Sequence, residues 1–76
     1  MFDYTVSNEA NNALFNDACK KIEQHLGFTH QEPSVDVDGS AFIIYEKDGC
    51  KIRIDNDFFV DAVFIESTVD LSPLFS

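Results

Sequence analysis

Asp48 and Gly49 stand between two apolar-rich runs, and this dipeptide constrains the fold more than any other feature of the chain. An Asp-Gly pair suits a two-residue type I′ turn, because both of its residues need a positive φ. The turn fixes the pairing of the strands on either side of it. The expected pairs are Lys47–Cys50, Glu46–Lys51, Tyr45–Ile52, Ile44–Arg53 and Ile43–Ile54. Side-chain alternation then gives this hairpin one apolar face.

A third strand, residues 59–66, is predicted to complete an antiparallel meander over residues 41–66. A two-residue loop before this strand would turn the carboxylate of Asp61 onto the apolar face without a partner. A one-residue change of register inverts every side chain, and a buried unpaired carboxylate is costly. We therefore expect a three-residue loop at 56–58, which sets Asp61 opposite Arg53 on the other face.

An amphipathic helix is predicted over residues 8–26, preceded by a short strand at residues 2–6. The apolar side chains recur every three or four positions, as in a helix with one buried stripe. They are Ala10, Leu14, Phe15, Ala18, Cys19, Ile22 and Leu26. Ser7 is the expected N-cap and Gly27 the expected left-handed residue at the other end. We expect Leu14 on this helix and Ile52 on the apolar face of the hairpin to be buried in the core.

The remaining segments are a connector at residues 27–40 and an apolar tail at residues 67–76. A short edge strand is possible around Val35 in the connector, and the tail should dock on the domain or on a partner. The chain therefore predicts one α+β domain, residues 1–76, with the helix packed on an antiparallel meander in the order β-α-β-β-β. The position of the first strand in the sheet stays open.

The balance of charge excludes several classes of partner. The 14 acids and 5 bases give a formal charge of −9. Direct binding of nucleic acid needs a basic surface, and so does docking on an anionic membrane. No run is long enough to span a bilayer, and the first residues show no signal-type apolar stretch. We expect a cytoplasmic protein.

The candidates for chemistry are weak. Asp36, Asp38 and Gly39 resemble part of a calcium loop, but Tyr45 stands where that loop needs a bidentate Glu. Cys19 and Cys50 lack metal-site spacing; they are expected to be small buried apolar groups, although a disulfide between them is possible. No group is identifiable that would orient a Cys-His pair for catalysis. We expect no enzyme, no metal site and no cofactor.

The outer face of the predicted sheet, which the helix leaves uncovered, is unusually apolar. With the chosen register it forms a candidate interface made of Phe42, Ile44, Phe59, Val63 and Ile65 together with Arg53 and Asp61. Such a cluster indicates a covered surface. The cover could be the C-terminal tail, a second copy of the chain or a different protein.

Three classes of function remain. The first is a small acidic, non-enzymatic interaction or inhibitor module, homodimeric through the outer sheet face. The second is a nucleic-acid mimic whose carboxylates block a basic DNA- or RNA-binding protein. The third is a small-ligand or metal-binding protein that uses the Asp-rich loops. Because the acids are scattered along the chain, we favour the interaction module.

Overall fold

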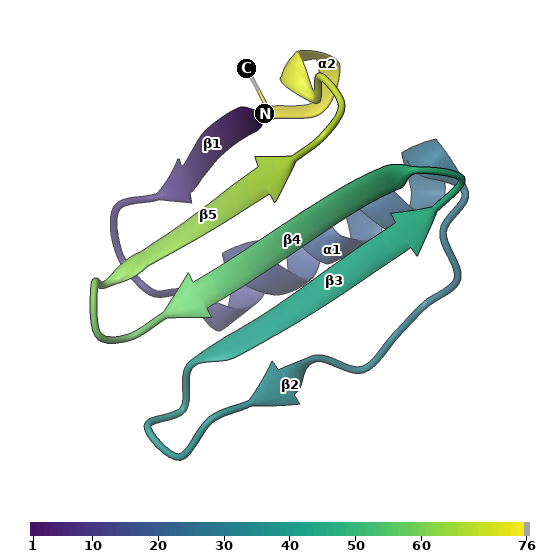
Figure 1. The fold of residues 1–76 in the computed structure, drawn as a ribbon. Helices are drawn as coiled ribbons and strands as arrows, with labels where there is room; N and C mark the ends of the chain where they lie inside the picture. Colours follow the sequence, from purple (N-terminus) through teal and green to yellow (C-terminus); the bar gives the residue numbers. More distant parts are fainter. Residues whose placement is uncertain (76) are drawn as a thin grey trace.

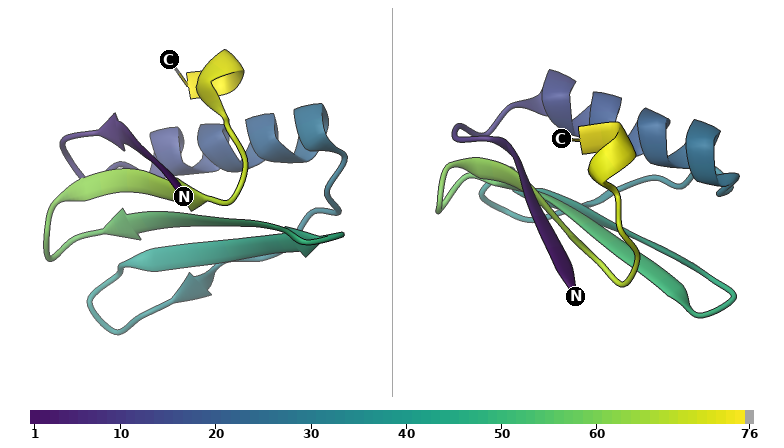
Figure 2. Two further views of the ribbon diagram at one scale, coloured as in Figure 1. Left: turned by 45° about the horizontal axis from the view of Figure 1, so that its top comes forward. Right: turned by 90° about the horizontal axis from the view of Figure 1, so that it is seen from above.

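The protein is an α+β fold in which one long helix packs on a five-stranded antiparallel sheet (Figure 1). The computed structural model describes residues 1–75. The elements are β1 (Phe2–Ser7), α1 (Asn12–Leu26), β2 (Ser34–Val35), β3 (Ala41–Lys47), β4 (Cys50–Asp57), β5 (Ala62–Ser67) and α2 (Ser72–Phe75). The strand order is β1-β5-β4-β3-β2, with α1 on one face of the sheet (Figure 2). The predicted fold class is confirmed, with β2 as an additional strand.

The hairpin of β3 and β4 has the predicted turn and register. Asp48 and Gly49 have φ values of 52° and 82°, as a type I′ turn requires. All five expected pairs form, and the ladder continues to Ala41 opposite Asn56. The hairpin was predictable because a local turn alone sets its pairing.

The predicted register of β5 is wrong. Arg53 lies opposite Glu66, five residues beyond the predicted partner Asp61. The strand β4 continues to Asp57. The turn before β5 therefore consists of residues 58–61 and not of the predicted residues 56–58. An odd shift inverts the faces, so Val63 and Ile65 point into the core, where both are fully buried. The observed register is favoured because it covers these two branched side chains with α1.

The start of α1 also differs from the prediction. The helix begins at Asn12, and Asn11, rather than Ser7, is its N-cap: the Asn11 Oδ1 accepts a hydrogen bond from the Leu14 N–H. The fully buried Asn56 on β4 holds this end, because its Oδ1 accepts from the Asn11 N–H and its Nδ2 donates to the Asn12 Oδ1. Leu14 is 37% exposed, so the expectation that it lies in the core is wrong.

The C-terminal end of α1 is the predicted one. Gly27 adopts the left-handed conformation, with φ 73°, and donates its N–H to the Glu23 carbonyl.

The core lies between α1 and the sheet. The buried apolar side chains are Phe15, Ala18, Cys19, Ile22, Ile43, Tyr45, Ile52, Ile54, Val63, Ile65 and Leu71. Ile52 is fully buried, in agreement with its expected place in the core.

The C-terminal tail docks on the same side of the sheet as α1 (Figure 2). Leu71 is buried in the core, and its N–H donates to the hydroxyl of Tyr4 on β1. The Tyr4 hydroxyl in turn donates to Asp70, and the Phe75 ring contacts the Tyr4 ring at 6.3 Å between centroids. The tail therefore packs against β1 and does not cover the outer sheet face.

In residues 1–75 no helix is both long enough and apolar enough to span a membrane.

Candidate functional site

The outer sheet face keeps only part of the candidate interface. Phe42 and Ile44 lie on this face and are partly exposed. The Arg53 guanidinium carbon stands 4.6 Å from the centroid of the Phe42 ring, and the same side chain forms two hydrogen bonds to Asp55, of 2.9 and 3.1 Å. Arg53 thus covers Phe42 and pairs with a neighbouring carboxylate, and the face is less apolar than the sequence had indicated.

The other predicted interface residues lie elsewhere. Val63 and Ile65 are in the core, for the reason of register given above. Phe59 and Asp61 belong to the turn between β4 and β5. Asp61 accepts a hydrogen bond from the Ala10 N–H, 2.8 Å away, and so makes no pair with Arg53. The structure therefore does not bring the seven candidates together on one surface.

Five exposed large apolar side chains lie at one end of the sheet, on β2 and on the loops that follow β2 and β4. Val37 and Phe59 are almost fully exposed, at 104% and 90%, and three neighbours in the same segments are at least 42% exposed. We call this set the apolar tip; it consists of Val35, Val37, Phe58, Phe59 and Val60. Large exposed apolar clusters on small proteins mark interaction sites.

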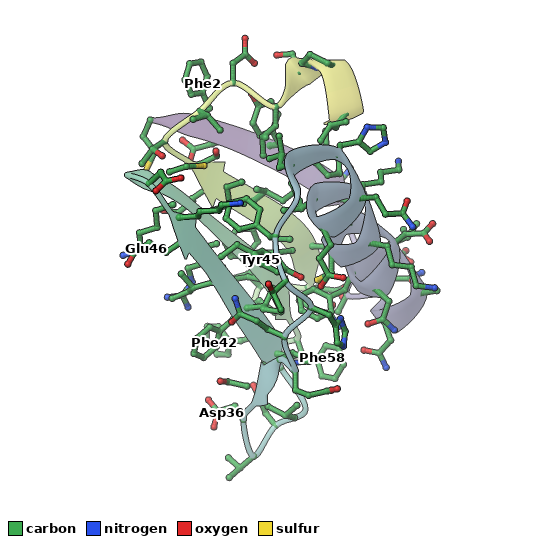
Figure 3. All side chains as sticks on the ribbon, turned by 90° about the vertical axis from the view of Figure 1, so that its right-hand side faces the viewer. Phe2, Asp36, Phe42, Tyr45, Glu46 and Phe58 are labelled. Carbon is green, nitrogen blue, oxygen red and sulfur yellow. The ribbon has the colours of Figure 1, made fainter. Side chains whose placement is uncertain are left out.

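Direct contacts join the two loops of the apolar tip. The Phe58 N–H donates to the Ser40 Oγ at 2.9 Å. The Phe58 ring packs over Gly39, where a Cβ atom would stand 2.6 Å from the ring carbon Cε2. In Figure 3 Phe58 and Asp36 both lie in the half of the molecule opposite Phe2. The loop between β2 and β3 and the turn between β4 and β5 are therefore in direct contact.

Both loops are held by their own hydrogen bonds. The Asp57 Oδ1 accepts from the N–H groups of Phe59 and Val60, at 2.8 and 3.2 Å. In the other loop the Asp36 N–H donates to the Ser40 carbonyl at 2.7 Å. Aspartate side chains commonly fold turns in this way. These hydrogen bonds give both loops of the tip a defined conformation.

Four aspartates flank the exposed apolar residues of the tip along the chain. They are Asp36, Asp38, Asp57 and Asp61. Residues 34–41 and 57–62, which build this end of the sheet, contain no Lys and no Arg. We call these four aspartates, which flank the exposed apolar residues in the two segments, the acidic border of the tip.

A polar cluster lies where α1, β3 and the connector after α1 meet, on the helix-covered side of the sheet. The Tyr45 hydroxyl donates to the Glu23 carboxylate, and His30 Nδ1 lies 3.1 Å from the same carboxylate. Burial raises the pKa of the Tyr45 hydroxyl, and the hydrogen bond to Glu23 raises it further. Cys19, Glu23 and His30 line a cavity of about 210 Å³ beside the connector.

This cluster does not make Cys19 a nucleophile. Burial raises the pKa of its thiol from 9.0 to about 11, so the thiolate is scarce at neutral pH. Cys19 and Cys50 are both free thiols, so the possible disulfide between them does not form. The hydrogen bonds of Glu23 to Tyr45 and His30 tie α1 to β3 and to the connector, which is a structural role.

The acidic loops form no metal centre in the described part of the chain. Among residues 1–75 no group of three or more His, Cys, Asp or Glu side chains is placed to hold a metal ion. Asp36 and Asp38 bind N–H groups of their own loop instead. These contacts shape the loop between β2 and β3.

Sequence reasoning missed most of the tip. The sequence places Val35 and Val37 in the connector, Phe58 in the predicted loop at 56–58 and Val60 on the third strand. It does not indicate that all four are exposed, as the structure shows for each of them. The available signal was the run Phe58, Phe59, Val60 directly after Asp57, an aspartate suited to a turn.

Compared with known proteins, the chain matches no family model, no curated sequence and no solved structure.

Proposed function

We propose that the protein is a small acidic, non-enzymatic interaction or inhibitor module that acts by covering a surface of another protein with its apolar tip. The observation that supports this proposal is the exposure of five large apolar side chains on two loops that fix one another. Binding residues commonly lie on loops that a rigid scaffold positions.

The energetics favour such a role. Burial of apolar surface contributes about 25 cal/mol per Å², and aromatic side chains supply the largest areas. Phe59 offers nearly its whole side chain for such a contact. Because Asp57 and Ser40 already order the loops, little further conformational entropy is lost when a partner binds.

The test compares two variants in capture experiments with an extract of the cells from which the protein comes. Val37→Ser with Phe59→Ser removes the two most exposed groups of the tip. Phe2→Ser is the matched control, because Phe2 is 43% exposed at the opposite end of the molecule (Figure 3). Proteins bound by wild type and by Phe2→Ser, and identified by mass spectrometry, should be lost with the tip variant. Equal capture by all three proteins would contradict the proposal.

A second candidate is a homodimer formed by the outer sheet face. It is supported by the partial exposure of Phe42, Ile44 and Phe64 on a face that neither helix covers. A two-fold dimer needs only one self-complementary surface. Sedimentation equilibrium should then show a dimer for wild type and a monomer for Ile44→Lys. A monomeric wild type at high micromolar concentration would exclude this candidate.

Nucleic-acid mimicry is a special case of the first proposal. It is supported by the four carboxylates that border the apolar tip. A mimic must compete with nucleic acid for its partner. Fluorescently labelled DNA or RNA bound to the captured partner should therefore be displaced by wild type, whereas an unchanged signal would rule out mimicry.

A further inference from the structure

We infer that the partner of the apolar tip is a folded protein whose contact surface is an apolar socket bordered by Lys and Arg side chains. This inference rests on the proposed function, because it names the partner of the same surface. It follows from the alternation of apolar and acidic side chains along the two loops of the tip.

Each exposed apolar group of the tip has a carboxylate close to it in the chain. Asp36 and Asp38 are the neighbours of Val37 on either side. Asp57 and Asp61 enclose the turn that carries Phe59. A partner that buries Val37 and Phe59 must therefore also approach these carboxylates.

Among residues 1–75 the carboxylates of the tip form no ion pair. Their contacts in the described residues are with N–H and hydroxyl groups, for example the Ser40 hydroxyl 3.1 Å from Asp38. The acidic partners in the ion pairs within residues 1–75 are Glu23, Glu32 and Asp55, all outside the tip. Removing unpaired carboxylates from water against a neutral surface is costly. Cations on the partner would offset that cost.

The same charges argue against the other occupants. A second copy of the chain would bring an acidic border against an acidic border, with a formal charge of −9 on each protein. Nucleic acid and anionic membranes carry the same sign of charge and would be repelled. A basic protein surface gains from both the apolar tip and the acidic border. Electrostatic steering would also speed its association.

The experiment places the photo-crosslinking residue p-benzoylphenylalanine at position 59, in the otherwise complete protein, and irradiates it in the cell extract. The cross-linked peptide of the partner is identified by mass spectrometry, and the partner is then purified. Its affinity is measured against wild type at 50 and 500 mM salt. Asp36→Asn with Asp38→Asn removes two charges from the tip. Asp17→Asn with Asp48→Asn removes two charges elsewhere and is the matched control.

We expect cross-linked peptides that contain or adjoin Lys and Arg, and an affinity at least tenfold weaker at 500 mM than at 50 mM salt. The tip pair should weaken binding at least fivefold more than the control pair, because only the tip carboxylates meet the partner. A neutral or acidic cross-linked surface, a salt-independent affinity, or equal effects of the two pairs would overturn this inference and leave the proposed function standing. Absence of any partner cross-linked at position 59 would overturn both.

Discussion

The Phe58 ring lies so close to Gly39 that a Cβ atom at position 39 would stand 2.6 Å from the ring. Gly39 has a φ of 90°, a conformation that residues with a side chain rarely adopt. The contact joins two loops that are far apart in sequence, and with the Phe58–Ser40 hydrogen bond it fixes the form of the apolar tip.

Gly39→Ala should therefore disturb the tip. We expect a loss of about 1–3 kcal/mol in the free energy of unfolding, from backbone strain and displacement of Phe58. Gly49→Ala is the control, because Gly49 has a φ of 82° but no neighbouring atom within 4 Å of an added Cβ. NMR spectra should show altered amide shifts at Phe58 and Phe59 only for Gly39→Ala. The same shifts in both variants would show that the contact has no such effect.

Asn56→Ala should destabilise the protein by about 1–3 kcal/mol, because the Asn11 N–H would lose its acceptor and the Asn12 side chain its donor. Urea denaturation measures the change. Asn8→Ala, at an exposed position before α1, should stay within about 0.5 kcal/mol of wild type. Equal losses for both variants would show that Asn56 does not hold the start of the helix.

Two apolar residues that the sequence assigns to the core should respond differently to truncation. Ile52→Ala should cost about 2–5 kcal/mol, because Ile52 is fully buried between α1 and the sheet. Leu14→Ala should cost about 1 kcal/mol or less, because Leu14 is 37% exposed. Urea melts of the two variants, followed by circular dichroism, compare these values. A larger loss for Leu14→Ala would contradict the observed packing of α1.

The pKa of His30 should be raised, mainly because its ring hydrogen-bonds to the Glu23 carboxylate. The contact favours protonated His30 in the folded state. Its contribution to stability is therefore fully present below the unfolded pKa of 6.5 and is lost as pH rises through the higher folded pKa. NMR titration of the His30 ring should show a larger fall of the pKa in Glu23→Gln than in Glu32→Gln. The reverse order would contradict the geometry.

The two thiols should differ in reactivity. Cys50 is partly exposed near the β3–β4 turn, whereas Cys19 is buried and burial raises the pKa of its thiol to about 11. A pKa two units above 9.0 means about a hundredfold less thiolate at a given pH. With a thiol reagent at pH 8, Cys50 should react first and Cys19 far more slowly, as single Cys→Ser variants would reveal. Similar rates would show that Cys19 is accessible.

Local chemistry determined the parts of this fold that the sequence predicts. The β3–β4 register follows from Asp48 and Gly49, and the end of α1 follows from Gly27, because the φ values of these residues decide each feature without distant contacts. The amphipathic stripe of α1 likewise placed Phe15 and Ile22 in the core.

Tertiary structure decided the rest. The partner of each β5 residue depends on which apolar side chains α1 covers, so Val63 and Ile65 entered the core and β5 moved by five positions relative to the prediction. The start of α1 depends on Asn56, a residue more than 40 positions away. The apolar tip depends on contact between Phe58 and Gly39, on separate loops. No local pattern carries such information, because these energies arise only when distant segments meet.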